Sequence, residues 1–374
     1  MISIWEKETF FAHQDIIIIG SGFVGLWSAY YLKKKHPDLK ITIVERGIIP
    51  TGASTRNAGF ACFGSLSELV YDIKTMGLDK TLALVEMRYK GLERIQKHFD
   101  ATAIDFEMCG GYELFDHSIK TEQLDEDIQY LNTLLKDITD TKKTYKRVDE
   151  RIATYGFANT VHLVKNNLEG FLHSGKLVQG LLQRVQSMGV QVLNGITITN
   201  IGQKDNGVEL ITNQPYHFTA SQLLICTNAF KDLLPDTDIV PARGQVLVTS
   251  PIPNLPWKGT FHSDEGYYYF RNLGNRVLLG GARNKAFEAE TTTEMEPTDF
   301  IQQALEDYLE NIILPHFKHQ YTIEHRWAGI MGMGSEKSPI VQQIAPNIFC
   351  AVRMSGIGVA LAPIIGSQVE SMMR

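Results

Sequence analysis

The segment at residues 20–25, Gly-Ser-Gly-Phe-Val-Gly, constrains the fold of this 374-residue chain more than any other feature. It follows four consecutive isoleucines at residues 16–19, a run typical of a strand buried on both faces. After it, apolar residues recur at helical spacing as far as three lysines at residues 33–35. A second apolar run at residues 41–44 ends at Glu45. This order of strand, Gly-rich turn, helix and strand predicts a βαβ unit that binds an adenine dinucleotide.

The residues of this unit have distinct expected roles. Gly20 allows the tight turn, Gly22 lets the backbone approach a pyrophosphate, and Gly25 allows close packing of helix and strand. The helix N-terminus adds N–H groups and a partial positive charge, and Glu45 is placed to accept hydrogen bonds from ribose hydroxyls. The candidate contacts are Gly20, Ser21, Gly22, Phe23, Val24, Gly25, Glu45 and Arg46. The pattern fits NAD or FAD, and a turn without a ligand is the alternative.

The segment at residues 52–60, Gly-Ala-Ser-Thr-Arg-Asn-Ala-Gly-Phe, separates these two cofactors. Its small and hydroxyl residues, together with Arg56, can neutralise a second side of a pyrophosphate. The stretch at residues 57–59 lets the backbone approach a planar ring. The candidate contacts are Gly52, Ala53, Ser54, Thr55, Arg56, Asn57, Ala58 and Gly59, with an ordinary surface loop as the alternative.

Composition excludes several classes of function. The chain has 36 Lys and Arg against 42 Asp and Glu, without the clustered cations that nucleic acid or an anionic membrane requires. Its four cysteines form no CxxC pair, so we expect no metal site and no dithiol centre. The N-terminal residues lack the order of a secretory signal, and no apolar stretch is long enough to span a membrane. We therefore expect a cytoplasmic location.

The rest of the pattern predicts an α/β protein with two discontinuous domains. Strands at residues 190–193, 222–226 and 348–352 extend the parallel layer, whereas residues 241–281 are typical of antiparallel strands. Helices are expected at residues 66–97, 122–138, 177–188 and 298–313 and at the C-terminus. We expect a Rossmann-type domain with a central parallel sheet from residues 1–65, 146–240 and 321–374. A second domain, an antiparallel sheet with helices, would comprise residues 66–145 and 241–320.

Further motifs occur in a fixed order along the chain. They are Leu-His-Ser-Gly-Lys-Leu at 172–177, Cys-Thr-Asn-Ala-Phe at 226–230, Pro-Ala-Arg-Gly-Gln at 241–245, Tyr-Tyr-Tyr-Phe-Arg at 267–271, Leu-Leu-Gly-Gly-Ala-Arg at 278–283, Trp-Ala-Gly at 327–329 and Met-Ser-Gly-Ile-Gly-Val-Ala-Leu-Ala-Pro at 354–363. With residues 20–25, Glu45 and residues 52–60, they resemble the D-amino-acid-oxidase-like family of FAD oxidoreductases. That family includes glycine oxidase, sarcosine oxidase and gamma-glutamylputrescine oxidase.

The resemblance implies further FAD contacts. Ile198 would face the adenine through its backbone, although a core isoleucine is the alternative. Residues 227–229 would turn past the dinucleotide, and residues 356–358 would meet the flavin edge that becomes negative on reduction. A simple Gly-rich loop is the alternative for the latter. The implied contacts are Ile198, Thr227, Asn228, Ala229, Gly329, Gly356, Ile357, Gly358, Val359 and Ala360. Because Gly329 lies near the place where sarcosine oxidases carry a flavin-linked cysteine, we expect the FAD to be non-covalent.

Departures from the family pattern bear on the substrate. Sarcosine oxidases carry basic residues at the places of Ala360 and near Cys62, and glycine oxidases carry an arginine where this chain has Ile330 and Met331. A buried carboxylate needs a paired cation, so these departures argue against a simple amino acid in the family's usual pose. The chain looks most like the gamma-glutamylputrescine oxidase branch, which favours an amine at the end of a larger molecule.

For the substrate wall the sequence favours Tyr267 and Tyr269, which alternate onto one face of a strand, with Arg243, Cys62 and Met331. Sheet-face packing of the tyrosines and a structural ion pair of Arg243 are the alternatives. The resemblance implies hydride transfer from the carbon beside a neutral amine to flavin N5, which gives an imine. Oxygen or another acceptor would reoxidise the flavin. Oxidation of an amino acid or 2-hydroxy acid, and a flavin-binding subunit that needs a partner, are the alternative functions.

Overall fold

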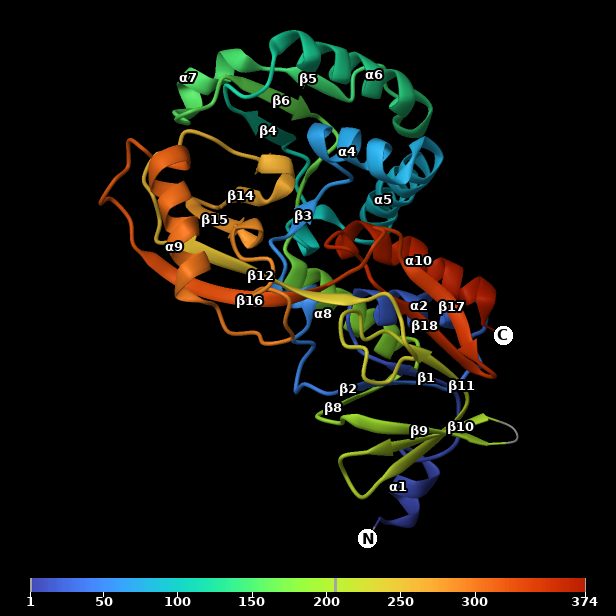
Figure 1. Cartoon of the computed structure of the whole chain (residues 1–374). Helices are drawn as coiled ribbons and strands as arrows, with labels where there is room; N and C mark the ends of the chain where they lie inside the picture. The colour runs from blue at the N-terminus through green and yellow to red at the C-terminus, as the bar shows by residue number, and fades with distance from the viewer. Residues whose placement is uncertain (1, 205–206, 374) are drawn as a thin grey trace. The chain divides into compact units, whose positions relative to one another are not determined.

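The computed structural model describes residues 2–204 and 207–373, which divide into two compact units. The first unit comprises the chain up to Arg56, Ser174–Ala242 and the chain from Met331. The second unit comprises Asn57–His173 and Arg243–Ile330. Figure 1 shows the elements of each unit along the chain.

A largely parallel sheet forms the centre of the first unit. Its strand order is β17 (Ile340–Ala345), β18 (Ile348–Val352), β11 (His217–Ile225), β1 (Gln14–Ile19), β2 (Ile41–Glu45) and β8 (Gln191–Asn194). All neighbours in this path are parallel except β17 and β18. Strands β9 (Ile198–Lys204) and β10 (Gly207–Thr212) extend it as an antiparallel hairpin on β11.

The helices of the first unit are α1 (Ile4–Glu8), α2 (Phe23–Lys35), α3 (Ala53–Arg56), α8 (Ser174–Ser187) and α10 (Gly358–Met372). Helix α2 contacts β1 and helix α10 contacts β17 of this sheet. Helix α2 is buried on almost every side because it packs against both α8 and α10. Gly366 of α10 lets this helix approach α2 closely, since a Cβ on Gly366 would lie 2.7 Å from the carbonyl carbon of Trp27.

The second unit contains a mostly antiparallel sheet. Its strand order is β16 (Ile323–Met333), β12 (Val240–Thr249), β15 (Arg276–Gly281), β14 (Tyr268–Leu273), β13 (Thr260–Ser263), β4 (Gly111–Phe115), β6 (His162–Asn166) and β5 (Tyr145–Arg147). Strands β3 (Phe60–Ala61) and β7 (Gly170–Phe171) form a separate pair. The ends of β12 and β16 belong to the first unit.

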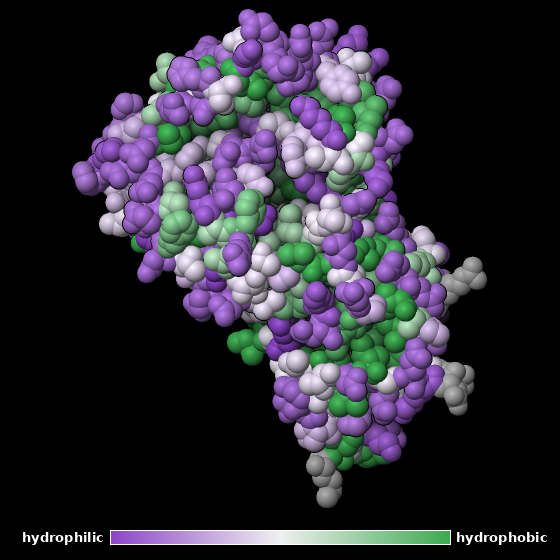
Figure 2. All heavy atoms as spheres, viewed as in Figure 1, coloured by the Kyte–Doolittle hydropathy of each residue, from purple (hydrophilic) through white to green (hydrophobic). Residues whose placement is uncertain are grey.

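Helices and turns complete the second unit. The helices are α4 (Leu66–Met76), α5 (Leu78–His98), α6 (Thr121–Thr139), α7 (Ile152–Tyr155) and α9 (Asp299–Tyr308), which continues as the π-helical turn η5 (Leu309–Ile313). Short 3₁₀ turns are η1 (Ala101–Ala103), η2 (Asp149–Arg151), η3 (Asp264–Gly266) and η4 (Arg283–Lys285). Helix α6 buries leucines such as Leu124 and Leu131, and its outer side is hydrophilic (Figure 2).

The two faces of the second sheet differ in character. One face carries a large aromatic and aliphatic cluster that includes Tyr112, Phe261, Phe270 and Leu279 and packs against Leu305 of α9. The rings of Phe261 and Phe270 are stacked with centroids 4.8 Å apart. Because side chains alternate along a strand, the residues next to these point to the other face. That other face carries polar and titratable groups.

The α/β class is confirmed, with differences in detail. The expected helix at residues 66–97 is two helices, because Gly77 with φ of 88° separates α4 from α5. Strand β14 begins at Tyr268, whereas Tyr267 ends the turn η3, so the expected strand alternation of Tyr267 with Tyr269 is wrong. Strands β5 and β6 join the second sheet, so residues 146–173, which we expected in the first domain, lie in the second unit.

Other boundaries also differ from the expected domains. Residues 57–65 lie in the second unit, where Phe60 pairs with Phe171. Residues 321–330 lie there as well, because β16 pairs with β12 at the edge of the second sheet. Within residues 2–204 and 207–373, no helix combines the length and apolar character that crossing a membrane requires.

We predict that Gly366→Ala destabilises the protein, because its Cβ would force α10 away from the backbone of α2. Overpacking of this kind typically costs about 1–3 kcal/mol, which would lower the apparent unfolding temperature by roughly 3–10 °C. Thermal unfolding monitored by circular dichroism measures the shift. Gly202→Ala is the control, because a Cβ there meets no atom closer than 3.8 Å. Equal unfolding temperatures for the two variants would contradict the packing argument.

Candidate functional site

The turn between β1 and α2 depends on glycine. Gly20 has φ of 104°, and its N–H donates to the carbonyl oxygen of Val44 at 2.8 Å. A Cβ on Gly25 would lie 2.1 Å from the carbonyl oxygen of Gly20, so a larger residue cannot stand there without displacing the turn. Helix α2 therefore begins directly above the end of β1, which is the geometry of a phosphate-binding turn.

Helix α2 begins beside α3. Gly22 is its N-cap, and a Cβ on Gly22 would meet Ser54 Oγ at 2.9 Å. Ser54 Oγ accepts the N–H of Phe23 at 2.8 Å. Thr55 Oγ1 donates to the carbonyl oxygen of Pro50 at 2.6 Å and fixes the start of this short helix. Serine and threonine of the segment at residues 52–60 thus lie against the Gly-rich turn.

Glu45 is buried at the end of β2. Its Oε2 accepts the backbone N–H of Ser21 at 3.0 Å and Ser21 Oγ at 2.9 Å, and its Oε1 accepts the N–H of Gly47 at 2.9 Å. The neighbouring guanidinium of Arg46 stacks on the Phe230 ring, with its central carbon 3.8 Å from the ring centroid. A carboxylate held in this way retains acceptor capacity for the hydroxyls of a ribose.

The loop between β18 and α10 is held in an unusual conformation. Arg353, Ser355 and Gly356 have positive φ of 61°, 48° and 83°. Asn228 Oδ1 accepts the N–H of Met354 at 3.2 Å, and the N–H of Ser355 donates to the carbonyl oxygen of Gly332 at 3.0 Å. Such strain, about 1–3 kcal/mol for each non-Gly residue, persists only where surrounding contacts impose it and is typical of ligand sites.

Arg353 anchors this loop. Its Nε and Nη2 donate to the carbonyl oxygen of Ser338 at 3.0 and 2.9 Å. Its Nη1 pairs with Asp238 Oδ2 at 2.5 Å. Hydrogen bonds from Ser335, and then the charge of Arg353, hold the pKa of the Asp238 carboxyl below its usual range. These contacts fix the strained backbone directly before α10.

The start of α10 fits a hydrogen-bonding ligand. Ser355 Oγ is buried without a hydrogen-bond partner, and a Cβ on Gly356 would meet only Met331 Sδ, at 3.5 Å. Gly358 opens the helix, whose first N–H groups carry a partial positive charge. Together with the Gly-rich turn and the acceptor oxygens of Glu45, these residues fit a dinucleotide whose far end carries a hydrogen-bonding ring.

The remaining expected cofactor contacts lie in both units. Ile198 is buried in the core of the first unit, and Thr227 Oγ1 donates to the carbonyl oxygen of Phe230 at 2.6 Å. The buried ones in the first unit also include Ala229, Val359 and Ala360. Residues 57–59 and Gly329 belong to the second unit, where the N–H of Gly59 donates to Asn57 Oδ1 at 2.8 Å.

The polar face of the second sheet carries a row of side chains across three strands. Strand register places Tyr269 opposite His262, and His262 opposite Glu113. On the other side Tyr269 stands opposite Gly280, and a Cβ on Gly280 would lie 2.5 Å from the Tyr269 ring. The glycine therefore lets the ring lie flat across the sheet. Burial raises the pKa of Tyr269 to about 12 and lowers the pKa of His262 to about 4, which leaves both neutral at pH 7.

Phe60 covers this row. Its ring lies edge-on to His262 at a centroid distance of 5.1 Å and to Tyr269 at 5.9 Å. A small apolar cluster around it includes Ala58, Val246 and Leu278. His262 Nε2 is buried without a hydrogen-bond partner. Apolar side chains thus surround one phenol and one neutral imidazole, both of which are half-buried.

Arg271 lies two residues beyond Tyr269 on the same face. Its guanidinium stacks over the Phe171 ring at 4.5 Å, and Nε and Nη1 are buried without hydrogen-bond partners. Burial lowers the pKa of Arg271 to about 10. A buried cation with free donors can pair with a carboxylate.

Buried carboxyls gather near the other end of the row. Glu169 Oε1 accepts the N–H groups of Phe63 and Gly64 at 2.8 and 3.1 Å, and Glu113 Oε2 accepts the N–H of Ser67 at 3.0 Å. Burial raises the pKa of Glu169 to about 8 and that of Glu113 to about 7. Of the residues that the structure describes, no three of the His, Cys, Asp and Glu type form a group able to hold a metal ion.

The residues expected to contact the substrate do not all lie on one face or in one unit. Tyr269 lies on the polar face, whereas Tyr267 packs against Phe287 at a centroid distance of 5.6 Å. Arg243 is buried in an ion pair with Glu290, Nη2 to Oε1 at 2.8 Å, which is the structural role left open from the sequence. Cys62 is buried in the second unit, and burial raises the pKa of its thiol. Met331 lies in the first unit.

His262, Arg271, Glu113 and Glu169 escaped sequence reasoning. The alternation of Tyr269 with Arg271 in residues 267–271 is a local signal that could have identified the arginine. His262 and Glu113 carried no such signal, because only the register of β13 with β14 and β4 places them beside Tyr269.

Comparison with known proteins identifies the family of this chain. The family described as FAD dependent oxidoreductase, DAO, matches residues 15–372. The chain is 24% identical to the probable oxidoreductase OrdL of Haemophilus influenzae over 382 residues, which cover 95% of this chain and 81% of the relative. The predicted FAD family and cofactor are thereby confirmed.

Solved structures share the fold. Glycine oxidase from Geobacillus kaustophilus superposes with a TM-score of 0.77 and 18% identity, covering 97% of this chain and 95% of that one. L-Proline dehydrogenase from P. horikoshii superposes with a TM-score of 0.76 and 18% identity, covering 96% of this chain and 93% of that one.

We predict that the buried carboxyls lower stability as pH rises from 6.5 to 8.5. The folded pKa values of Glu113 and Glu169, about 7 and about 8, lie above the ordinary pKa of a glutamate, so the folded protein binds more protons in this window than the unfolded chain does. Stability present at low pH is therefore lost as pH rises through the folded values. Glu169→Gln, which keeps the acceptor oxygen for Phe63 and Gly64, should be more stable than the wild type at pH 8.5, with a smaller gain at pH 6.5.

Thermal unfolding at a series of pH values measures this effect. Glu122→Gln, on the exposed side of α6, is the matched control and should leave the pH profile unchanged. His262 has the opposite effect on stability, because its lowered pKa makes the folded protein less stable as pH falls from about 6.5 to about 4. The range from pH 6.5 to 8.5 lies outside that effect. An identical pH profile for wild type and Glu169→Gln would show that Glu169 does not remain protonated.

Proposed function

The chain belongs to the DAO family of FAD-dependent oxidoreductases, and we propose that it oxidises the C–N bond of a secondary or terminal amine in a larger molecule. When bound, FAD would supply the acceptor for the hydride on the carbon beside the amine nitrogen, and the resulting imine would be hydrolysed by water. We further propose the gamma-glutamylputrescine oxidase branch as the closest in substrate, on the sequence features named above.

The chain's own residues hold the cofactor in this proposal. The turn at residues 20–25 and α3 take the pyrophosphate, and Glu45 accepts from the ribose hydroxyls. The start of α10, with Gly356, Ile357 and Gly358, offers N–H groups where negative charge develops. Non-covalent attachment agrees with the glycine at position 329.

Tyr269 is the residue that we place against the substrate. Its ring is fixed by Gly280 beneath and Phe60 beside it. His262, neutral because of burial, and the apolar cluster around Phe60 exclude water from the same face. Positioning and exclusion of water are the contributions that a flavin reaction requires from the protein. We retain Cys62, Met331 and Tyr267 as further candidates for the substrate wall.

The pairing of Arg243 with Glu290 is the observation that carries the preference for an amine. Arg243 was the remaining candidate to anchor a carboxylate, and its Nε and Nη2 donate to Glu290 while its Nη1 donates to the carbonyl oxygen of Glu296. Ala360, Cys62 and Met331 supply no cation. The row of Tyr269, His262 and Glu113 itself carries no cation, which suits an amine, and the one cation named on this face is Arg271, two residues beyond Tyr269.

Arg271 favours a second candidate function. Its unpartnered Nε and Nη1 lie on the same face as Tyr269, where they could pair with the carboxylate of an amino acid or 2-hydroxy acid. The same flavin chemistry would then act on the carbon beside that carboxylate. A flavin-binding subunit that needs a partner remains the third candidate.

Anaerobic visible absorption distinguishes these functions. We expect polyamines and acylated polyamines to bleach the flavin band, and glycine, sarcosine, D-amino acids and 2-hydroxy acids to leave it unchanged. Tyr269→Phe should slow the bleaching about 10-fold or more without loss of bound flavin. Tyr321→Phe, a half-buried tyrosine of the aromatic cluster, is the control and should bleach at the wild-type rate.

The opposite outcomes are equally informative. Bleaching by small amino acids alone, abolished in Arg271→Gln, would reject the amine proposal in favour of the second candidate. A flavin that no compound bleaches, recovered with a second chain, would favour the partner subunit. Rapid reoxidation in air would identify oxygen as the acceptor, and its absence would indicate another acceptor.

We predict that acid precipitation releases all of the flavin, because Gly329 lies near the place where sarcosine oxidases carry their flavin-linked cysteine. Absorption of the supernatant and the pellet measures the partition. Two results together would refute non-covalent binding. The pellet would stay yellow after precipitation, and mass spectrometry of its digest would find peptides that carry flavin.

A further inference from the structure

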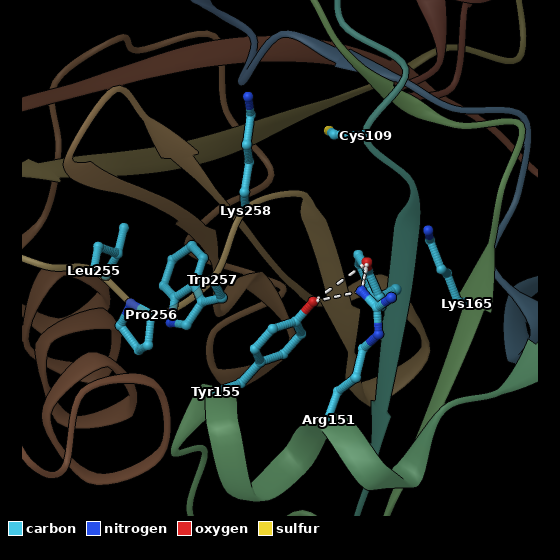
Figure 3. Close-up of a pocket in the computed structure, with 9 residues that line it drawn as sticks. Cys109, Arg151, Tyr155, Lys165, Leu255, Pro256, Trp257 and Lys258 are labelled. Carbon is cyan, nitrogen blue, oxygen red and sulfur yellow. Dashed lines mark hydrogen bonds between the residues drawn. The ribbon is translucent and has the colours of Figure 1, made fainter.

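A pocket of about 380 Å³ lies in the second unit, apart from the row of Tyr269, His262 and Glu113. Side chains around it include Tyr112, Arg151, Tyr155, Lys165, Trp257 and Lys258 (Figure 3). Its volume is within the range of sites for small organic ligands. The proposed amine oxidation makes no use of these residues.

The pocket belongs to the opposite side of the sheet from the substrate row. Tyr112 stands opposite Lys165 on β6 and Phe261 on β13, whereas the next residue, Glu113, stands opposite His262. Successive side chains on a strand point to opposite faces. Tyr112 and Lys165 therefore lie on the face of the aromatic cluster, away from Tyr269.

Three cations converge on the pocket without a matching set of carboxylates. Lys165 Nζ lies 5.5 Å from the Tyr112 ring centroid, and in the described part of the chain it has no ion-pair partner. Burial lowers the pKa of Lys165, and the positive charges of Arg151 and Lys146 lower it further. Lys258 pairs with Glu107, but both side chains are exposed, so this pair is weak. An anion would relieve the repulsion.

Arg151 is oriented by two phenols. Its Nη1 donates to the hydroxyl oxygens of Tyr112 and Tyr155 at 2.9 and 3.0 Å, as Figure 3 shows. These partners are neutral, so the positive charge of Arg151 is not cancelled. It remains available to an anion in the pocket.

The walls are flat and fixed. The Tyr112 ring stacks on Phe261 at 4.9 Å, and Trp257 is buried between Phe157, Phe261 and Phe270. Leu255 and Pro256 extend the apolar side. Tyr112 and Trp257 are only 3% and 4% exposed, so they fix the back of the pocket, and the half-buried Leu255 and Pro256 are the apolar side chains that a flat group can contact.

We propose that this pocket binds a small organic anion that carries a phosphate or carboxylate on a flat apolar group. The charged end lies against Lys165, Lys258 and Arg151, and the flat group lies against Leu255 and Pro256. The residues that line the pocket include neither an expected FAD contact nor Tyr269, so the proposal does not depend on the identity of the oxidised substrate.

Isothermal titration of the FAD-loaded protein with phenyl phosphate tests this proposal. We expect saturable binding that is tighter than that of inorganic phosphate or benzyl alcohol, because each lacks one of the two recognised parts. Binding should weaken at high salt. Lys165→Gln should weaken it about 10-fold, the effect of one charged hydrogen bond. Lys143→Gln, an exposed lysine outside the pocket, is the matched control and should leave it unchanged.

Three results would overturn the proposal. One is the absence of saturable binding at millimolar phenyl phosphate. Another is equal affinity in wild type, Lys165→Gln and Lys258→Gln. The third is a change of the flavin absorption band that follows the binding curve, which would place the anion beside the flavin. Retention of flavin and of the wild-type unfolding temperature in Lys165→Gln establishes that its fold is intact.

Discussion

The contact between the carbonyl oxygen of Gly20 and the Cα of Gly25 is the constraint on which the first unit depends. It seats α2 directly on the turn after β1, so the N-terminus of this helix, Ser54 and Glu45 lie around one point. Gly366 repeats the principle at the other side of α2, where α10 approaches the backbone of Trp27. The two helix starts that we propose as cofactor contacts are thus positioned through glycines, not through large side chains.

In the second unit, the two faces of one sheet have different roles. Its aromatic cluster supplies the stability, and its other face holds groups whose burial is unfavourable. His262, Arg271, Glu113 and Glu169 all have pKa values displaced by burial toward their neutral forms. Groups of this kind persist where a function requires them, since apolar residues of similar volume would be more stable. The displaced pKa values therefore point to the same face as Tyr269 does.

Local signals made much of this fold predictable. The isoleucines of β1, the glycines of the turn and Glu45 are neighbours in sequence or follow at a fixed spacing, so the βαβ unit could be predicted from the sequence. Fold class, family and cofactor followed from that unit and from ordered motifs. Which side chains meet on the polar face could not be predicted from the sequence. Strands β4, β13 and β14 come from distant parts of the chain, and their register decides which residues are neighbours.

Particular residues show where the sequence was insufficient. Tyr267 lies in a run that looks like a strand, but the left-handed Glu265 forms a turn, and the strand starts one residue after Tyr267. The partner of Arg243 is 47 positions away, so no local pattern announces the ion pair. Lys165 and Arg151 come from a region that we assigned to the other domain, and their pocket was therefore not expected.

The interleaved course of the chain has a consequence for its biosynthesis. The backbone leaves the first unit after Arg56, returns at Ser174, leaves again after Ala242 and returns at Met331. During translation, β1 and β2 emerge long before β18, which completes their sheet through β11. The first unit cannot finish folding while the ribosome still holds the last segment, whereas the second unit is complete at Ile330. A chain truncated before β18 would expose an unpaired strand edge on β11. Premature termination should therefore yield aggregates, not a smaller working domain.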